Sequence, residues 1–475
     1  LYLYALPKEL VSVGVGSSSY TVAKASQDEG YVILRADGSD AYVALDFLQK
    51  YTNFTYQYWE EPNRVRIVTA FGSKDIVTVQ KDTAVRWKAG IKSDILSKVS
   101  KGTELFVLDE PEEIDQWTRV LTEDGFIGYI RDSKISDIGQ KEETAPEFTE
   151  PEYTSISKDY KINMTWHQVT NMEANNYLLN KIADAKGLTT ISPTWFSVTD
   201  ETGTISSLAS ADYVKLAHEA GREVWGLIDN FNEAFDETTD LAYASVRSRI
   251  IEQLLAEAAS CGMDGINVDF ENLKEAGIPH YLQFLRELTS AAHAQNLVVS
   301  VDTPVPQAYT MYYQRGEQAR FVDYMIVMAY DEHFAGSEEA GSVSSLPFVQ
   351  QAVEEMTRVM PADQVICGIP FYTRVWTEKF GQSAITSEVL GMDGAKNYAK
   401  ENQMTETWDA SLGQNVATVE TSDARYTIWM EDEQSMEEKL KVIQSADLAG
   451  VAEWKLGFER ADIWSLISEY IETNS

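Results

Sequence analysis

The sequence predicts an α/β protein with a (β/α)8 TIM barrel over residues 159–475, preceded by two small β-rich domains. Within the barrel range, strand-like and helix-like segments alternate eight times. Most of the strand-like segments are near-continuous apolar runs, which is typical of parallel strands buried on both faces. No GxGxxG motif follows the first of them, and this disfavours the main alternative, a doubly wound open sheet.

Short strand-like runs separated by turn residues fill the first 136 residues. YVILR, FTYQYW and RVRIVTA, together with the helix-like VALDFLQKYT, predict an α+β module over residues 1–72. DIVTV, TAVRW, TELFVL, WTRVLT and GFIGYI predict a small β-barrel over residues 73–136. Residues 137–158 are acidic, contain two prolines and have no hydrophobic period, so we expect an inter-domain linker there.

The predicted barrel strands read, in chain order, KINMTWHQV, LTTISPTWFSV, EVWGLIDNF, DGINVDFE, LVVSVDTPV, YMIVMAY, QVICGIPFY and GVAEWKLGF. Amphipathic segments lie between most of them. Two of these segments end in Gly262 and Asn296, residue types favoured just after a helix. Between the seventh and eighth strands, residues 386–434 hold helix-like and strand-like pieces, so we expect a small α+β insertion beside the barrel mouth.

Composition argues against several classes of partner. With 75 acidic and 39 basic residues the formal charge is −36, which repels nucleic acid and anionic membranes. No apolar run is long enough to span a bilayer. Cys261 and Cys367 have no metal-ligand spacing, and the five histidines form no HxxxH motif, so we expect neither a metal nor another cofactor.

The stretch DGINVDFE is unusual for a buried strand because Asn267, Asp269 and Glu271 alternate with apolar residues. Side chains alternate between the two faces of a strand, so these three share one face, which in a barrel is the interior. Val268 and Phe270 then pack outward against the helices. Glu271 lies at the C-terminal end of the strand, where barrel enzymes carry their catalytic groups.

Two neighbouring carboxyl groups on one interior face raise each other's pKa through repulsion and desolvation. Glu271 is therefore suited to act as a general acid, with Asp269 beside it for charge stabilisation. The alternative is a structural polar cluster in which the carboxylates are paired with arginines.

DGINVDFE resembles the signature DGxDxDxE of glycoside hydrolase family 18, the chitinase-like barrels. Asp264, Gly265, Asp269 and Glu271 match that signature, and Asn267 stands where the family usually has another aspartate. The resemblance implies a TIM-barrel glycosidase.

Motifs on later strands extend this resemblance over most of the chain after residue 158. MAYD, residues 328–331, is similar to the family's MxYD, and GIPFY, residues 368–372, is similar to its strand seven. Trp454, in AEWKLG, occupies the position of the strand-eight indole that lies under the reacting sugar.

The wider sequence of this region resembles the bacterial branch of spore-germination and cortex-lytic N-acetylglucosaminidases. Residues 1–72 resemble the copper amine oxidase N-terminal module, which does not imply copper, and residues 73–136 resemble bacterial Src-homology-3-like domains. These resemblances imply that the N-terminal modules hold cell-wall peptidoglycan. They also imply a bacterial protein that is secreted or cell-wall associated, from which we expect a signal or anchor to have been removed.

The resemblance also implies roles for individual residues in a substrate-assisted, retaining reaction. Glu271 would protonate the leaving oxygen and later activate water. Asp269 would orient the sugar's acetamido group, Tyr330 would donate a hydrogen bond to the acetamido oxygen, and Asp331 would assist at the same subsite.

Asn267 would contact Asp269 by a hydrogen bond but cannot ionise. The aspartate pair that shares a proton in many relatives is then missing. We therefore expect Asp269 to stay ionised more readily than in those relatives.

Aromatic side chains at strand ends are candidates for sugar contact, because apolar sugar faces pack on aromatic rings. Core packing is an equal alternative for three of them, Trp195, Trp225 and Trp376. His167 and His333 are expected to line the cleft. The full set of aromatic candidates is Trp454, Tyr372, Trp195, Trp225 and Trp376.

The leading hypothesis is a glycosidase that cleaves β-1,4 bonds next to N-acetylglucosamine in peptidoglycan or spore cortex. The same chemistry on chitin or on the core of N-glycans is the first alternative. The others are a non-catalytic glycan-binding barrel and a structural coat or wall protein.

Overall fold

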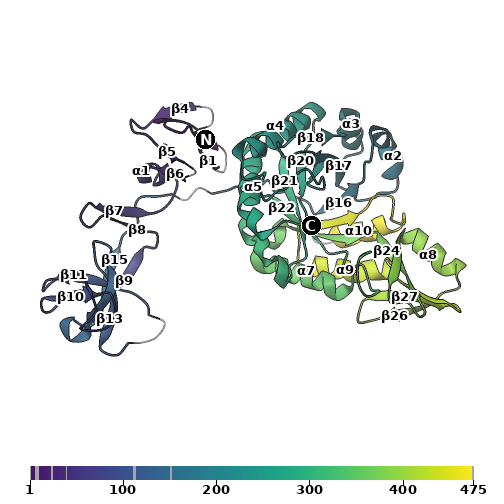
Figure 1. Cartoon of the computed structure of the whole chain (residues 1–475). Coiled ribbons are helices and arrows are strands. Elements are labelled where there is room, and N and C mark those ends of the chain that lie inside the picture. Colours follow the sequence, from purple (N-terminus) through teal and green to yellow (C-terminus); the bar gives the residue numbers. More distant parts are fainter. Residues whose placement is uncertain are drawn as a thin grey trace.

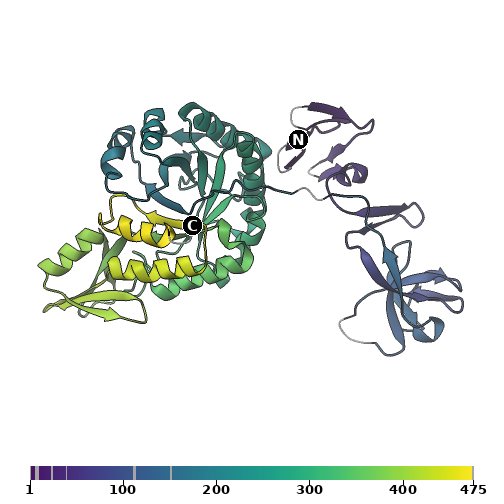
Figure 2. The ribbon, with the colours of Figure 1, turned by 180° about the vertical axis from the view of Figure 1, so that it is seen from behind.

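The computed structural model describes a barrel and, before it in the chain, several small β-sheets (Figure 1). Figure 2 shows the same arrangement from behind. Leu1, residues 150 and 151 of the predicted linker, and the last three residues of the predicted barrel domain lie outside the described residues. The described residues are 2–5, 10–22, 25–38, 40–110, 114–149 and 152–472.

The first predicted module contains small antiparallel sheets around a short helix. Val11, Val13 and Phe47 are buried at its centre. Its elements are a four-stranded sheet of β1 (Tyr2–Ala5), β2 (Leu10–Val13), β3 (Ser19–Val22) and β4 (Ala25–Asp28), the hairpin of β5 (Leu34–Asp37) and β6 (Asp40–Val43), α1 (Leu45–Leu48), and the hairpin of β7 (Thr55–Trp59) and β8 (Arg64–Val68).

The second module is a seven-stranded antiparallel sheet in the order β11-β10-β14-β13-β12-β9-β15. All five predicted strands are present, as β9, β10, β12, β13 and β14. The prediction missed β11. The strands are β9 (Gly72–Thr78), β10 (Thr83–Arg86), β11 (Ile95–Val99), β12 (Glu104–Val107), β13 (Trp117–Leu121), β14 (Ile127–Arg131) and β15 (Gly139–Glu143).

The predicted start of the linker at residue 137 is wrong. β15 lies within the predicted linker and pairs with β9, with Gly139 opposite Ile76. Its GQKEE sequence is largely exposed, so this edge strand has no apolar face that a sequence pattern could reveal.

Eight parallel strands close into the predicted barrel, because β16 pairs with both β17 and β29. All eight lie where the sequence predicts them. In ring order they are β16 (Ile162–His167), β17 (Thr190–Val198), β19 (Glu223–Asp229), β20 (Gly265–Asp269), β21 (Val298–Pro304), β22 (Tyr324–Met328), β23 (Val365–Pro370) and β29 (Gly450–Trp454), and β18 (Ile205–Ser207) extends the sheet from β17.

Helices surround the barrel (Figure 1). Gly262, predicted to follow a helix, has φ of 77° just after α4, where a residue without Cβ is favoured. The helices are α2 (Leu178–Lys181), α3 (Ala211–Glu219), α4 (Ala244–Cys261), α5 (Ile278–His293), α6 (Arg315–Gln318), α7 (Leu346–Val359), α9 (Glu433–Ser445) and α10 (Ile463–Glu472). Short 3-10 turns lie at Asp132–Lys134, Met172–Tyr177, Glu275–Gly277, Ala308–Tyr313 and Ala362–Gln364.

The two faces of the barrel strands bury different side chains. Ile266 and Val268 of β20, and Phe270, which directly follows this strand, belong to the large core between strands and helices. Trp225 and Leu227 belong to a separate cluster inside the barrel. The period-two reading of DGINVDFE is therefore confirmed, and its polar residues point inward.

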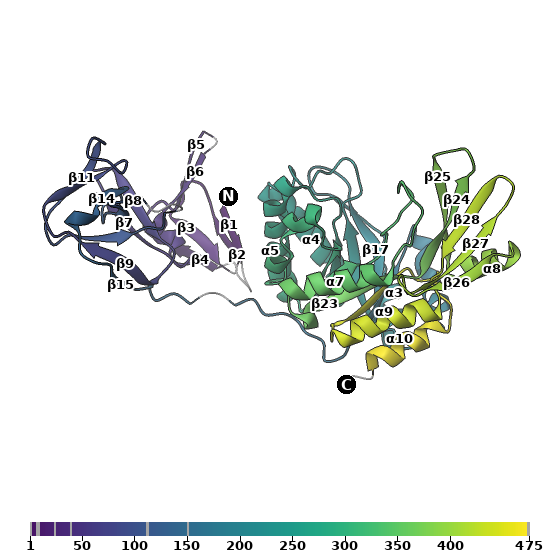
Figure 3. The same cartoon turned by 90° about the horizontal axis from the view of Figure 1, so that it is seen from below.

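The predicted insertion is confirmed between β23 and β29. Its five-stranded antiparallel sheet has the order β25-β24-β28-β27-β26, and Val375, Ala417 and Ile428 share a buried core with residues of α8. Figure 3 shows this sheet standing beside the barrel. The elements are β24 (Tyr372–Lys379), β25 (Ile385–Gly391), α8 (Met392–Glu401), β26 (Thr405–Asp409), β27 (Gln414–Glu420) and β28 (Ala424–Trp429).

Candidate active site

Three aspartates lie side by side on neighbouring strands at the C-terminal end of the barrel. Asp229 of β19 is opposite Asp269 of β20 in the strand register. Val268 is opposite Val301 of β21, so Asp302, the next residue of β21, is adjacent to Asp269. We call Asp229, Asp269 and Asp302 the aspartate row.

Asn267 lies just before the row and has four hydrogen-bond partners. Its Oδ1 accepts from Trp166 Nε1 and Ser192 Oγ, both at 3.0 Å. Its Nδ2 donates to Ser300 Oγ at 3.1 Å and to Asp302 Oδ1 at 2.9 Å. The expected hydrogen bond to Asp269 is therefore wrong, because the strand register turns the amide toward β21.

Asp269 is buried, with 7% of its surface exposed. Burial raises the pKa of its carboxyl well above the usual range, and the charges of Asp302, Glu271 and Asp229 raise it further. The expectation that Asp269 ionises more readily than in relatives with a second aspartate stays a prediction. The amide at Asn267 removes one negative neighbour, but Asp302 on the next strand supplies another.

Glu271 follows β20 and is held through its backbone. Its N–H donates to Asn230 Oδ1 and its carbonyl accepts from Asn230 Nδ2, each at 2.9 Å. Burial raises the pKa of its half-buried carboxyl, and the charges of Asp331 and Asp229 raise it further. A raised pKa favours the protonated form that a general acid needs.

Tyr330 and Asp331 lie in the loop that follows β22, close enough to the acids of the site to interact with them electrostatically. Asp331 has φ of 55°, a left-handed conformation that is uncommon outside glycine and concentrates at functional sites. Its Oδ1 accepts a hydrogen bond of 2.5 Å from the Tyr372 hydroxyl. The Tyr330 ring lies edge-on to Trp166 and to Tyr372, with centroids 6.2 and 6.3 Å apart.

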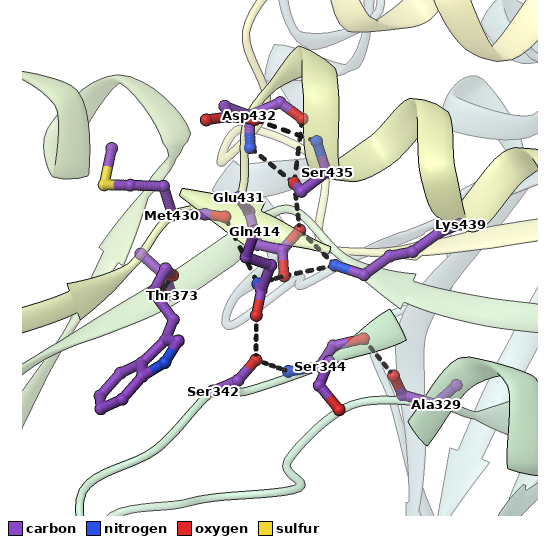
Figure 4. Close-up of polar contacts among 12 residues, drawn as sticks. Ala329, Ser342, Ser344, Thr373, Gln414, Met430, Glu431, Asp432, Ser435 and Lys439 are labelled. Atoms are coloured by element: carbon purple, nitrogen blue, oxygen red, sulfur yellow. Dashed lines mark hydrogen bonds and ion pairs between the residues drawn. The ribbon is translucent and has the colours of Figure 1, made fainter. Parts of the chain in front are cut away.

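A buried polar cluster supports the loop that carries these two residues (Figure 4). Ser344 Oγ donates to the Ala329 carbonyl at 2.7 Å, and Ser342 Oγ donates to Gln414 Oε1 at 2.6 Å. Gln414 donates in turn to Glu431 at 2.8 Å. The loop after β22 is thereby fastened to the insertion.

Glu431 forms an ion pair with Lys439 of α9 at 2.5 Å, and neither side chain is exposed. Ser435 Oγ also donates to Glu431. We call Glu431, Lys439, Gln414 and Ser435 the paired cluster.

Of the aromatic candidates, Trp454 fits a sugar contact best. It is half-buried at the end of β29, and its ring centroid lies 5.9 Å from that of Trp166. Tyr372 is buried and its hydroxyl is engaged with Asp331, so it holds that carboxylate rather than offering an open ring.

The sugar contacts predicted for Trp195 and Trp225 do not agree with the structure. Trp225 is fully buried inside the barrel, stacked on Tyr324. Trp195 is 1% exposed and donates to Asn175 at 2.9 Å. Trp376 is also buried, so the core alternative holds for all three rings.

The two histidines differ. His333 is half-buried on the loop after β22, with Nδ1 2.9 Å from the Ser342 carbonyl. His167 is buried against Tyr213 of α3, and burial lowers its pKa to about 4. It lies outside the barrel wall, so its predicted place in the cleft is wrong.

Asp229, Asn230 and Asp302 were missed by the sequence reasoning. The signal was present for Asp302, because Ser300 and Asp302 alternate with apolar residues in SVDTP as the polar residues do in DGINVDFE. Asp229 ends the run VWGLI, which has no polar side chain, in the same way.

Within the described residues, no group of three His, Cys, Asp or Glu side chains is arranged to hold a metal ion. A search of the same part of the chain for a helix long and apolar enough to cross a bilayer also gives none.

A closed (β/α)8 barrel with a glutamate at its mouth is an arrangement that many glycosidases use. Residues 163–459 match the model of glycosyl hydrolases family 18, and the chain belongs to that family.

The chain is 25% identical over 281 residues to the glycosylase YvbX of Bacillus subtilis, covering 56% of this chain and 80% of that protein. It is also 25% identical over 248 residues to the cortical fragment-lytic enzyme of B. subtilis, covering 50% of this chain but only 57% of that enzyme.

Solved structures share the fold at lower identity. The Bacillus cereus spore cortex-lytic enzyme SleL has a TM-score of 0.60 at 19% identity, covering 70% of this chain and 78% of that one. A chitinase from Chromobacterium violaceum has a TM-score of 0.58 at 19% identity, covering 66% of this chain and 99% of that one.

Proposed function

We propose that this glycosidase cleaves β-1,4 bonds next to N-acetylglucosamine by a retaining, substrate-assisted mechanism. The observation that carries the proposal is the position of the Glu271 carboxyl group and its raised pKa. Its carboxyl stands at the barrel mouth beside Asp269, and both burial and neighbouring carboxylates favour its protonated form. The backbone hydrogen bonds to Asn230 fix its place.

In the first step Glu271 gives its proton to the glycosidic oxygen as the bond to the anomeric carbon breaks. The acetamido oxygen of the same sugar attacks that carbon and forms a cyclic oxazolinium-like intermediate. Asp269 accepts a hydrogen bond from the acetamido N–H and stabilises the positive charge. The Tyr330 hydroxyl donates to the acetamido oxygen, and Asp331 helps to fix this subsite.

In the second step the deprotonated Glu271 takes a proton from water, which attacks the anomeric carbon and reopens the ring. The acetamido group and the acid are both restored. The two attacks occur on opposite faces, so the configuration at the anomeric carbon is retained.

Peptidoglycan or spore cortex is the proposed substrate, supported by the names of the cortical fragment-lytic relatives. Chitin is the alternative supported by the chitinase structures. We infer that the protein acts outside the cell or at the cell wall. The β-rich modules over residues 1–72 and from 73 onward are proposed to hold it near its glycan, which raises the local substrate concentration.

The test is incubation of the full chain with purified peptidoglycan, spore cortex and chitin oligomers, followed by mass spectrometry of the released ends. The Glu271→Gln variant is compared with Glu275→Gln, which makes the same change at an exposed residue nearby. Products from the unmodified protein and from Glu275→Gln alone support the proposal. Binding without products in all three proteins would replace it with a glycan-binding barrel.

A further inference from the structure

Asp302 is a buried member of the aspartate row to which the proposed mechanism assigns no role. It is 3% exposed on the interior face of β21 and adjacent to Asp269 in the strand register. Neighbouring strands lie about 4.8 Å apart, so carboxyl groups that point the same way from adjacent positions approach each other closely. Its Oδ1 accepts the hydrogen bond from Asn267.

One oxygen of each carboxyl has no partner. Within the part of the chain that the structure describes, Asp269 Oδ1 and Asp302 Oδ2 are both buried and neither accepts a hydrogen bond from a donor. A buried acceptor without a donor is costly, and two ionised carboxylates side by side are costlier still. A single proton held between the two carboxyls removes both costs.

Two further acids act on the pair. The charges of Glu271 and Asp229 raise the pKa of Asp269 and the charge of Glu271 raises that of Asp302, while Asn267 donates a hydrogen bond to Asp302. No cation is among the groups that act on either aspartate in the described ranges. A shared proton is therefore the means by which the pair lowers its charge.

We propose that Asp302 is the positioning residue for Asp269: the two carboxyls share one proton, which Asp302 carries while Asp269 faces the substrate. The proton passes from the Asp269 carboxyl to the Asp302 carboxylate, and the charge of the pair stays the same. The Asp302 hydroxyl then donates to the Asp269 carboxylate and fixes it as the acceptor for the acetamido N–H. This role rests on the proposed function.

The position of the pair follows from the sequence. Most relatives, by the resemblance stated above, have an aspartate where this chain has Asn267. In this chain Asn267 donates its amide hydrogen bond to Asp302 Oδ1, and Asp302 of β21 is the second carboxyl beside Asp269. The amide fixes which oxygen of Asp302 remains available to Asp269.

The first test needs no substrate. Free energies of unfolding are measured by urea denaturation from pH 4 to pH 9 for the full chain, Asp302→Asn, Asp269→Asn and the double variant. The shared proton raises the folded-state pKa of the pair, so the unmodified protein loses stability as pH rises from the ordinary aspartate range through that raised value. Each single variant shows a smaller loss, because burial still raises the pKa of the carboxyl that remains, and the effects of the two substitutions are not additive in the double variant.

Carbon-13 NMR of carboxyl-labelled aspartate gives the direct readout. The two signals are expected to move together in one step above the ordinary aspartate range, and each single substitution lowers the pH at which the other titrates. Asp393→Asn, which changes an exposed carboxyl far from the row, leaves the step in place. Independent titration of the two carboxyls would overturn the proposal.

The second test is kinetic. Asp302→Asn keeps an N–H that can donate to Asp269, so its kcat is expected to stay within about threefold, whereas Asp302→Leu loses about 10- to 100-fold in kcat, the range seen when a partner that orients a working side chain is removed. KM changes little in both. Equal losses in the two variants would refute the donor role.

The two proposals can fail separately. If the unmodified protein releases no product from any glycan, the proposed function fails while the titration still decides whether the carboxyls share a proton. If Glu271→Gln abolishes activity and the aspartates titrate independently, only the role of Asp302 fails.

Discussion

The aspartate row and the paired cluster are both buried groups of charged side chains, but they differ in how their charges are balanced. In the paired cluster, Glu431 has the Lys439 ammonium at 2.5 Å and further donors in Gln414 and Ser435. In the row, the only charges that act on Asp269 and Asp302 within the described residues are those of other acids, and one oxygen of each has no partner.

This difference distinguishes a charged cluster that stabilises the fold from one that is suited to catalysis. Burial raises carboxyl pKa values in both places. For Glu431 the Lys439 ammonium opposes the effect of burial, and the resulting pKa is about 7. What distinguishes the row is like charge without compensation, an arrangement that costs stability and persists at working sites. The comparison predicts opposite outcomes when the two groups are changed.

The largest effect is expected from Glu271→Gln at the mouth. Loss of a general acid lowers kcat by about 10²- to 10⁴-fold. The free energy of unfolding should stay equal or increase, because the substitution removes a carboxyl group whose ionised form is disfavoured by burial and by the charge of Asp331. Urea denaturation beside kinetics checks this, and a large loss of stability would place Glu271 with the structural group.

Lys439→Met should have the reverse signature. It leaves the Glu431 carboxylate buried without its cation, which costs about 3–5 kcal/mol of unfolding free energy. Lys441→Met on the same helix is the matched control, because its ion pairs with Glu437 and Glu438 are exposed and contribute little to stability. Equal effects of the two substitutions would show that burial of the pair does not matter.

Glu453 sharpens the comparison because it is unpaired but lies on the helix side of β29. Both of its carboxyl oxygens are buried without a partner. Glu453→Leu should raise the unfolding free energy by about 1–3 kcal/mol by removing unsatisfied polar atoms. Activity should be nearly unchanged, since this carboxyl lies outside the mouth.

The gain from Glu453→Leu should depend on pH. Burial and the charge of Glu459 raise the folded-state pKa of Glu453, so the unmodified protein loses stability as pH rises above the ordinary glutamate range. Thermal unfolding at pH 5 and pH 8 therefore tests the sign, with the larger gain expected at pH 8. A gain that is greater at pH 5 contradicts it.

Asp229→Asn should have the smallest effect. The pKa of Glu271 is raised by burial, then by Asp331 and then by Asp229. Removing the Asp229 charge lowers that pKa, so the alkaline limb of the kcat/KM profile moves to lower pH while the maximum changes by less than about tenfold. An alkaline limb that stays at the same pH would mean that the charge of Asp229 does not affect the pKa of Glu271.

The sequence predicted most of the fold because the barrel strands are long apolar runs with clear turns between them. It also predicted which residues of DGINVDFE point inward, since alternation on a strand is a local property. The polar edge strand β15 carried no such signal. Its pairing with β9 depends on an open sheet edge that only the folded module reveals.

The site was predicted less completely because strand register is not a local property. Asn267 and Asp302 are 35 residues apart, and nothing near either of them tells that they share a hydrogen bond. Likewise, Trp225 and Trp454 both lie on barrel strands, but only the register shows that the first is enclosed and the second reaches the mouth.

The hydrogen bond from Tyr372 to Asp331 joins the first strand of the insertion to the loop beside the acid. A cleft of about 1020 Å³ runs along the insertion sheet and is lined in part by Glu378 of that strand and by Trp429. We expect a long form of the proposed glycan substrate that reaches this cleft to contact the same strand that carries Tyr372. Binding energy from distant sugars would then be used at the acid, so longer glycans should raise kcat more than they lower KM.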